Sequence, residues 1–121
     1  MKPNLSIPAG DAPSELILED ITIGDGTEAV AGTNVEVHYV GVAWSTQRQF
    51  DASWDRSETF EFRLGAGQVI SGWDQGVAGM KVGGRRRITI PAHLGYGSQG
   101  VGGDIKGGET LVFVVDLLNV N

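Results

Sequence analysis

The chain has 121 residues, a formal net charge of −6 and a pI near 4.7. This length fits one domain with a buried core, and the acidic balance argues against a general nucleic-acid-binding protein. The sequence contains no cysteine, which excludes a disulfide framework, thiolate catalysis and a cysteine metal site.

The first half of the chain predicts an extended tail followed by strands. Residues 1–14 are polar and interrupted by prolines, which predicts an extended N-terminal tail. They lack the apolar core of a signal peptide, so we expect a cytoplasmic protein. Alternation of apolar residues predicts strands over 16–23, 34–42 and 59–64, whereas residues 46–57 are polar and predict an irregular connection.

The second half predicts one short helix between strands. Apolar residues recur at helical spacing from Val69 and Ile70 onward, at Trp73, Val77 and Met80, and give this helix one apolar face. Residues 85–91 predict a strand, and 111–120 are apolar on both faces as far as Asp116, which suits a central strand. Between these strands, residues 93–109 are rich in glycine and predict a mobile flap.

This order of elements predicts an α+β domain, an antiparallel sheet with one helix packed on a face. We expect a single domain over residues 15–121. The longest apolar stretch is far shorter than the ~20 residues that span a bilayer, so we expect no membrane contact. His38 and His93 share no metal-ligand spacing, and we expect neither a metal site nor a cofactor.

Three polar motifs have simpler interpretations than the ligand sites they imitate. Residues 65–70 resemble a dinucleotide fingerprint but end in Ile70 and lack a βαβ context. Residues 85–87 are three arginines that could contact phosphate, but on a strand they alternate between faces, which favours a solvated strand end. Asp51 and Asp55 imitate a glycosidase carboxylate pair, but the adjacent Arg56 favours an ion pair.

Aromatic residues from separate elements could form one hydrophobic cup with a single acid. They occur in the motifs Phe50-Asp51, Phe60-Glu61-Phe62, Ser71-Gly72-Trp73, Gly95-Tyr96-Gly97 and Leu111-Val112-Phe113. The pattern alone does not separate a pocket from an ordinary core. Strand alternation places Phe60 and Phe62 on one face, so we expect both to be core or both to line a site.

Six motifs in one order resemble the FKBP-type peptidyl-prolyl cis-trans isomerases, the tacrolimus- and rapamycin-binding family. The resemblance covers the chain from about residue 33 to residue 120, and it implies a five- to six-stranded antiparallel sheet wrapped around one short helix. The motifs are Val37-His38-Tyr39-Val40-Gly41, Phe50-Asp51-Ala52-Ser53, Val69-Ile70-Ser71-Gly72-Trp73, Gly76-Val77-Ala78-Gly79-Met80, Gly95-Tyr96-Gly97 and Thr110-Leu111-Val112-Phe113.

The resemblance also implies an apolar pocket for proline. Trp73 would be the floor on which the proline ring lies, and three aromatic residues, Tyr39, Phe60 and Phe113, would be its walls. Phe50 would shape one side of the pocket.

The remaining implied roles concern the rim and the polar groups. Val69 and Ile70 would form the rim, where the Ile70 backbone N–H would hold a substrate carbonyl. Asp51 and the Tyr96 hydroxyl would be the polar groups near the rotating amide. The two other implied positions are Arg56, which would pair with Asp51 and orient Tyr39, and Ile105, which would close the pocket from the flap.

The sequence departs from the family pattern in the flap, at Val101, Asp104 and Lys106-Gly107-Gly108. These differences bear on substrate preference and macrolide affinity rather than on the pocket floor. The resemblance implies a minimal, monomeric isomerase that accelerates rotation of X–Pro bonds during protein folding. Its partners would be proline-containing polypeptides, with macrolides such as tacrolimus or rapamycin as inhibitors, and neither nucleic acid nor membrane.

Two alternatives to catalysis stay open at this stage. The same cup could hold proline peptides or a macrolide as a non-catalytic binding module. The aromatic residues could also be the core of a purely structural or chaperone domain.

Overall fold

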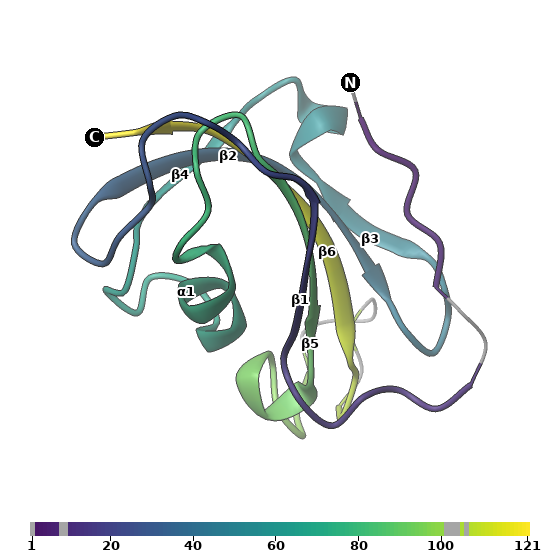
Figure 1. Ribbon diagram of the computed structural model, residues 1–121. Coiled ribbons are helices and arrows are strands. Elements are labelled where there is room, and N and C mark those ends of the chain that lie inside the picture. Colours follow the sequence, from purple (N-terminus) through teal and green to yellow (C-terminus); the bar gives the residue numbers. More distant parts are fainter. Residues whose placement is uncertain (1, 8–9, 101–104, 106) are drawn as a thin grey trace.

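One antiparallel sheet dominates the computed structural model, which describes residues 2–7, 10–100, 105 and 107–121. Within these residues the sheet has six strands, in the order β1-β5-β6-β2-β3, and β4 also pairs with β2 (Figure 1). The strands are β1 (Ile17–Thr22), β2 (Asn34–Ala43), β3 (Gln49–Ala52), β4 (Phe60–Arg63), β5 (Arg85–Ile90) and β6 (Leu111–Val120).

A single short α-helix, α1 (Ser71–Val77), packs on one face of the sheet within the described ranges (Figure 1). Two glycines on α1 permit this close packing. A Cβ at Gly72 would meet Ile90 at 2.5 Å, and a Cβ at Gly76 would meet Ile88 at 2.9 Å. The helix therefore lies directly against β5, and the predicted α+β fold with a sheet around one helix is confirmed.

The sheet buries apolar side chains on both faces. Toward α1, the core is built around fully buried residues of the strands and the helix, such as Val37, Ile88 and Val77. On the outer face, Val112 and Val114 of β6 pack with side chains of β2 and β3. Strand β6 lies between β5 and β2, so the central position that its two apolar faces predict is confirmed.

The N-terminal segment covers part of this outer face. Leu5 and Ile7 pack against the outer apolar clusters, and Ile7 is only 9% exposed. Lys2 pairs with Asp55 at 2.8 Å, and the Trp44 indole N–H donates to the Gly10 carbonyl at 3.1 Å. In Figure 1 the segment runs beside β3, across the sheet from α1. The segment is thus extended but docked.

The predicted irregular connection over residues 46–57 is wrong. Residues Gln49–Ala52 form β3, and Ser53–Arg56 form a short 3-10 helix, η1. Strand β3 has only four residues, so alternation within it carries little signal. Its conformation is set by antiparallel pairing with β2, for example of Asp51 with Gly41.

The prediction of a solvated end for the three arginines of β5 is also wrong for two of them, Arg85 and Arg86. Arg85 pairs with Asp116 at 2.7 Å. Arg86 pairs with Asp20 of β1 at 2.7 Å, and its side chain is only 11% exposed. It also donates to the carbonyl oxygens of Gly76 and Ala78 at the end of α1. These contacts satisfy carbonyl groups that a helix terminus leaves without intrahelical partners.

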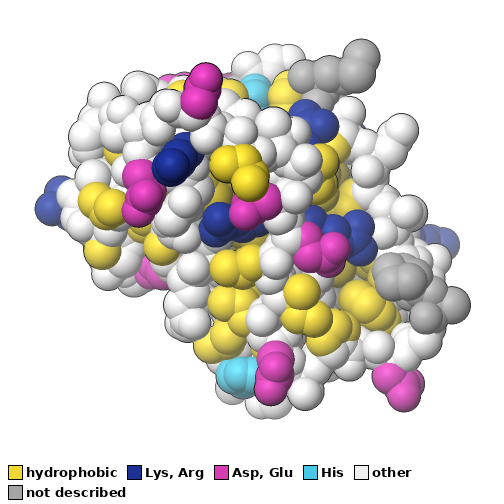
Figure 2. All heavy atoms as spheres, in the orientation of Figure 1, with side chains coloured by type: hydrophobic (Ala, Val, Ile, Leu, Met, Phe, Trp, Pro, Cys, Tyr) yellow, Lys and Arg dark blue, Asp and Glu magenta, His cyan; other side chains and the backbone are white. Residues whose placement is uncertain are grey.

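Strand β1 is an exposed edge strand, with all six residues accessible to solvent. Figure 2 shows apolar side chains on this face interspersed with acidic and basic side chains. Within the described residues, no helix has the length and apolarity needed to cross a membrane.

Candidate active site

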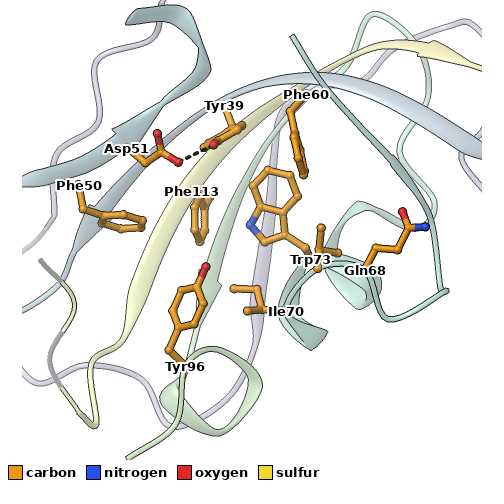
Figure 3. A pocket seen from close by; sticks show the side chains of 10 residues that line it. Tyr39, Phe50, Asp51, Phe60, Gln68, Ile70, Trp73, Tyr96 and Phe113 are labelled. Carbon is orange, nitrogen blue, oxygen red and sulfur yellow. Dashed lines mark hydrogen bonds between the residues drawn. The ribbon is translucent and has the colours of Figure 1, made fainter. Parts of the chain in front are cut away.

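A cavity of about 410 Å³ opens between the sheet, α1 and the loop after β5 (Figure 3). Among the residues that the structure describes, its lining is mostly aromatic and aliphatic, with one carboxylate. The lining residues are Tyr39, Phe50, Asp51, Phe60, Gln68, Val69, Ile70, Trp73, Tyr96 and Phe113. Pockets of this size, apolar with a few converging polar groups, are typical ligand sites.

Trp73 forms the floor of this cavity. It stands in the first turn of α1, where its N–H bonds to the Ile70 carbonyl at 2.9 Å, and it is 3% exposed. The rings of Tyr39 and Phe113 meet it edge-on, with centroids 5.0 and 5.2 Å away, and Phe60 does so at 5.9 Å. Edge-to-face packing fixes the plane of the indole, so a ring laid on it meets a preformed surface.

Close packing of two phenylalanines depends on Gly41 in β2. A Cβ there would meet both Phe113 and Phe50 at 2.7 Å. These two rings instead pack edge-to-face, with centroids 5.5 Å apart. The missing side chain therefore lets β3 deliver Phe50 and its neighbour Asp51 to one end of the cavity.

Three polar groups interlock at this end. The Tyr39 hydroxyl donates to Asp51 Oδ2 at 2.5 Å, while Arg56 donates through Nη1 to Asp51 Oδ1 and through Nη2 to the Tyr39 hydroxyl oxygen at 3.0 Å. Burial and the bond to Asp51 raise the pKa of Tyr39, and the bonds to Tyr39 and Asp51 raise the pKa of Arg56. At neutral pH the phenol is therefore a donor and the guanidinium is charged.

Tyr96 supplies a second hydroxyl from the opposite side. It follows a short 3-10 helix, η2 (Ala92–Leu94), and its hydroxyl points into the cavity (Figure 3). Gly97 has a φ of +66° and bonds to the Ala92 carbonyl at 2.8 Å, which turns the chain sharply after the tyrosine. Burial, and to a lesser degree the charge of Asp51, raise the pKa of Tyr96.

The cavity lining includes all the residues predicted for the site except two. Arg56 stands behind the carboxylate rather than in the lining. Ile105 is 6% exposed and belongs to the core cluster, and the cavity lining does not include it. The flap positions Val101, Asp104 and Lys106 lie outside the described residues.

Two features of the site differ from the sequence-based expectation. Phe60 lines the cavity, but Phe62 is 4% exposed and belongs to the core, so the expectation that both share one role is wrong. Gln68 lines the cavity and was not predicted. Its Oε1 accepts the Arg63 N–H at 2.9 Å. The sequence signal that could have predicted Gln68 is its position directly before Val69, which was predicted for the rim.

Comparison with known proteins defines the class. Residues 26–118 match the family described as FKBP-type peptidyl-prolyl cis-trans isomerase. The chain therefore belongs to this family of isomerases, and the resemblance of its motifs is confirmed.

Particular relatives match over nearly the whole chain. An "FK506-binding protein" of Streptomyces anulatus is 61% identical over 120 residues, covering 98% of this chain and 97% of the relative. A "Probable FK506-binding protein" of Corynebacterium glutamicum is 49% identical, with 98% of each chain covered.

Solved structures agree with the fold. The crystal structure of AtFKBP13 has a TM-score of 0.82 and 35% identity, covering 91% of this chain and 96% of that one. The crystal structure of FkpA from Escherichia coli has a TM-score of 0.80 and 36% identity, covering 92% of this chain and 51% of that one.

Proposed function

We propose that the aromatic cavity is the place where this isomerase turns X–Pro bonds, and that it assists protein folding by doing so. The observation that carries the proposal is the Trp73 floor, nearly buried and held between edge-on aromatic rings. A proline ring is compact and apolar enough to lie on such a floor. The peptide bond before it would then lie near Tyr96 and Asp51.

The chemistry asks for shape and a dry environment rather than a reactive group. An X–Pro amide rotates over a barrier of ~18–20 kcal/mol because resonance keeps it planar. The planar amide is strongly dipolar, and twisting it reduces the charge separation. An apolar cavity therefore disfavours the planar ground state more than the twisted transition state, and every ~1.4 kcal/mol gained gives a tenfold faster rotation.

The polar groups would position the substrate without exchanging protons. Both carboxylate oxygens of Asp51 already accept hydrogen bonds, from Tyr39 and Arg56. Asp51 is therefore already engaged as a hydrogen-bond acceptor. Rotation about the X–Pro amide breaks no covalent bond of the substrate, so it requires no proton transfer. The Tyr96 hydroxyl can donate to a substrate carbonyl, and we assign the Ile70 backbone N–H to a second one.

The same cavity is proposed to bind a macrolide inhibitor such as tacrolimus or rapamycin. Two relatives that match nearly the whole chain carry FK506 binding in their names. We also propose that the protein acts as a monomer. Saturation with a macrolide should abolish isomerase activity if both ligands occupy this site.

Refolding of a proline-limited substrate protein tests the proposal. Uncatalysed X–Pro isomerisation takes ~10–100 s at 25 °C, so a substoichiometric amount of enzyme should shorten the slow phase visibly. An unchanged slow phase, together with macrolide binding, would favour the non-catalytic binding module. A short X–Pro peptide is assayed in parallel. If the slow refolding phase is unchanged, this assay shows whether catalysis itself is absent or only recognition of a folding chain.

A further inference from the structure

Glu109, just before β6, is a buried acid that does not line the cavity. It is 6% exposed. Its carboxylate accepts the Ser45 backbone N–H at 3.0 Å and the Ser45 hydroxyl at 2.5 Å. The next residue, Thr110, accepts the Trp44 N–H through its carbonyl at 2.9 Å. A buried carboxylate is unfavourable unless it is hydrogen-bonded, so this pairing fixes Glu109 against the segment after β2.

Glu109 is connected to the cavity through two glycines, Gly108 and Gly97. The Gly108 N–H donates to the Gly97 carbonyl at 2.9 Å. Next to it, a Cβ at Gly107 would overlap the Ser98 carbonyl oxygen, so the two backbones approach more closely than a side chain allows. Gly97 directly follows Tyr96, whose hydroxyl points into the cavity (Figure 3). Covalent bonds and one backbone hydrogen bond thus join Glu109 to Tyr96.

We propose that Glu109 is a positioning residue for Tyr96, acting through Gly108 and Gly97. The hydrogen bonds from Ser45 fix the side chain of Glu109. Glu109 in turn fixes the backbone at Gly108, whose N–H donates to the Gly97 carbonyl. Tyr96 is 38% exposed, so packing alone restrains its ring only partly. Its direction into the cavity therefore depends on the backbone that carries it. This inference rests on the proposed isomerase site.

Loss of the Glu109 side chain should act mainly on substrate recognition. A less restrained Tyr96 would still leave the Trp73 floor and the aromatic walls in place. We expect Glu109→Ala to lower kcat/KM about threefold to tenfold, chiefly through KM, and to weaken macrolide binding by a similar factor. Glutamine can still accept the Ser45 N–H and donate to its hydroxyl oxygen, so Glu109→Gln should restore most of the loss.

The chain offers a direct probe because it contains only two tyrosines. Ring resonances of tyrosine-labelled protein report Tyr96 and Tyr39 separately, with Tyr96→Phe giving the assignment. Glu109→Ala, Glu109→Gln and Ser45→Ala are compared with wild type, and Glu15→Ala is the control that removes an exposed acid. Thermal unfolding, KM, kcat and macrolide affinity are measured on each.

The proposal expects Tyr96 resonances to shift or broaden in Glu109→Ala, those of Tyr39 to stay, and Glu109→Gln to resemble wild type. Unchanged Tyr96 signals and KM in a less stable Glu109→Ala protein would reduce Glu109 to a structural role and overturn the inference. Equal changes in both tyrosines would overturn it as well. If Glu109→Ala does not fold, Ser45→Ala decides by the same criteria. An inactive wild type contradicts the proposed function instead, and the tyrosine signals still decide the inference.

Discussion

Replacing Trp73 should weaken ligand binding and stability together, because the residue belongs to the cavity and to the core. It is 3% exposed and packs edge-to-face with four aromatic rings, those of Tyr39, Phe60, Phe62 and Phe113. Truncation of a buried tryptophan to alanine costs about 3–5 kcal/mol of unfolding free energy. Trp73→Leu keeps part of the volume, and we expect it to lose about 1–3 kcal/mol.

The effect on binding follows from the area between ligand and floor. A proline or pipecolyl ring on the indole buries on the order of 100 Å² of apolar surface, most of it the ring's own because Trp73 is only 3% exposed, which is about 2.5 kcal/mol at ~25 cal/mol per Å². Leucine offers a smaller and less flat surface. If about half of this term is lost, the macrolide Kd rises about tenfold. Calorimetric titration of Trp73→Leu measures this change.

Tryptophan emission provides a second assay. Trp44 and Trp54 would obscure the signal, so the titration belongs in a Trp44→Phe, Trp54→Phe background. Neither residue lines the cavity, and phenylalanine can keep the stacking of Trp54 on His38, whose ring centroids are 4.1 Å apart. Saturating macrolide should change the emission of Trp73.

Phe62 is the matched control. It is 4% exposed, and its ring packs edge-to-face with that of Trp73, with centroids 5.6 Å apart, but it does not line the cavity. Phe62→Leu should therefore lower the unfolding free energy and leave macrolide affinity within about twofold, since a twofold change is well under 1 kcal/mol. Equal losses of affinity in both variants, or emission of Trp73 that ignores saturating macrolide, would refute the assignment of Trp73 as the floor.

Four further outcomes test other parts of the site and the fold. Asp51→Val should lower activity without abolishing it, and the activity of the wild type should be nearly flat from about pH 6 to about pH 8, because no proton is transferred; a steep pH–rate profile would contradict this role. The folded-state pKa of Tyr39 is raised above its ordinary value of 10.0, so its contribution to stability is present below that pH and is lost as the pH rises through the folded-state pKa. Unfolding curves above pH 10 should therefore show a smaller loss of stability for Tyr39→Phe than for wild type, each measured against its own value at neutral pH. Gly41→Ala should destabilise the protein by about 1–3 kcal/mol in denaturant titrations, because the new methyl group would meet two aromatic rings at 2.7 Å. Amide exchange should be faster over residues 93–109 than over 111–118, apart from positions such as Gly97 and Gly108, whose N–H groups are hydrogen-bonded, and equal protection of both segments would contradict the predicted flap.

The sequence predicts the strands and the helix wherever a pattern is long enough to read. Strand β6 has ten residues with apolar side chains on both faces, and its central place followed from that alone. Strand β3 has four residues and takes its conformation from β2, so local pattern could not find it. The burial of Arg86 was equally hidden, because its acceptors are carbonyl groups at the end of α1.

In the site, too, the sequence pattern predicts only part of the arrangement: it gives the face of a strand on which a side chain lies, but not how far that side chain is from the cavity. Alternation along β4 correctly gave one face to Phe60 and Phe62, and their rings stack with centroids 5.6 Å apart. A face says nothing about distance from the cavity mouth. Phe60 pairs with Val37, two residues from Tyr39, whereas Phe62 pairs with Val35 farther along β2. One ring therefore meets the cavity and the other lies in the core.

An apolar cavity of about 410 Å³ must be held open against closure by its own walls. Edge-to-face rings resist this because each ring is fixed by its neighbours rather than free to fall into the space. The Tyr39–Asp51–Arg56 cluster resists closure at the polar end. Its three groups hydrogen-bond to one another, and these bonds keep their side chains from moving into the cavity. Both devices are in place before a substrate arrives. The cavity thus receives a proline ring without first ordering its own side chains, which keeps the free-energy cost of binding low.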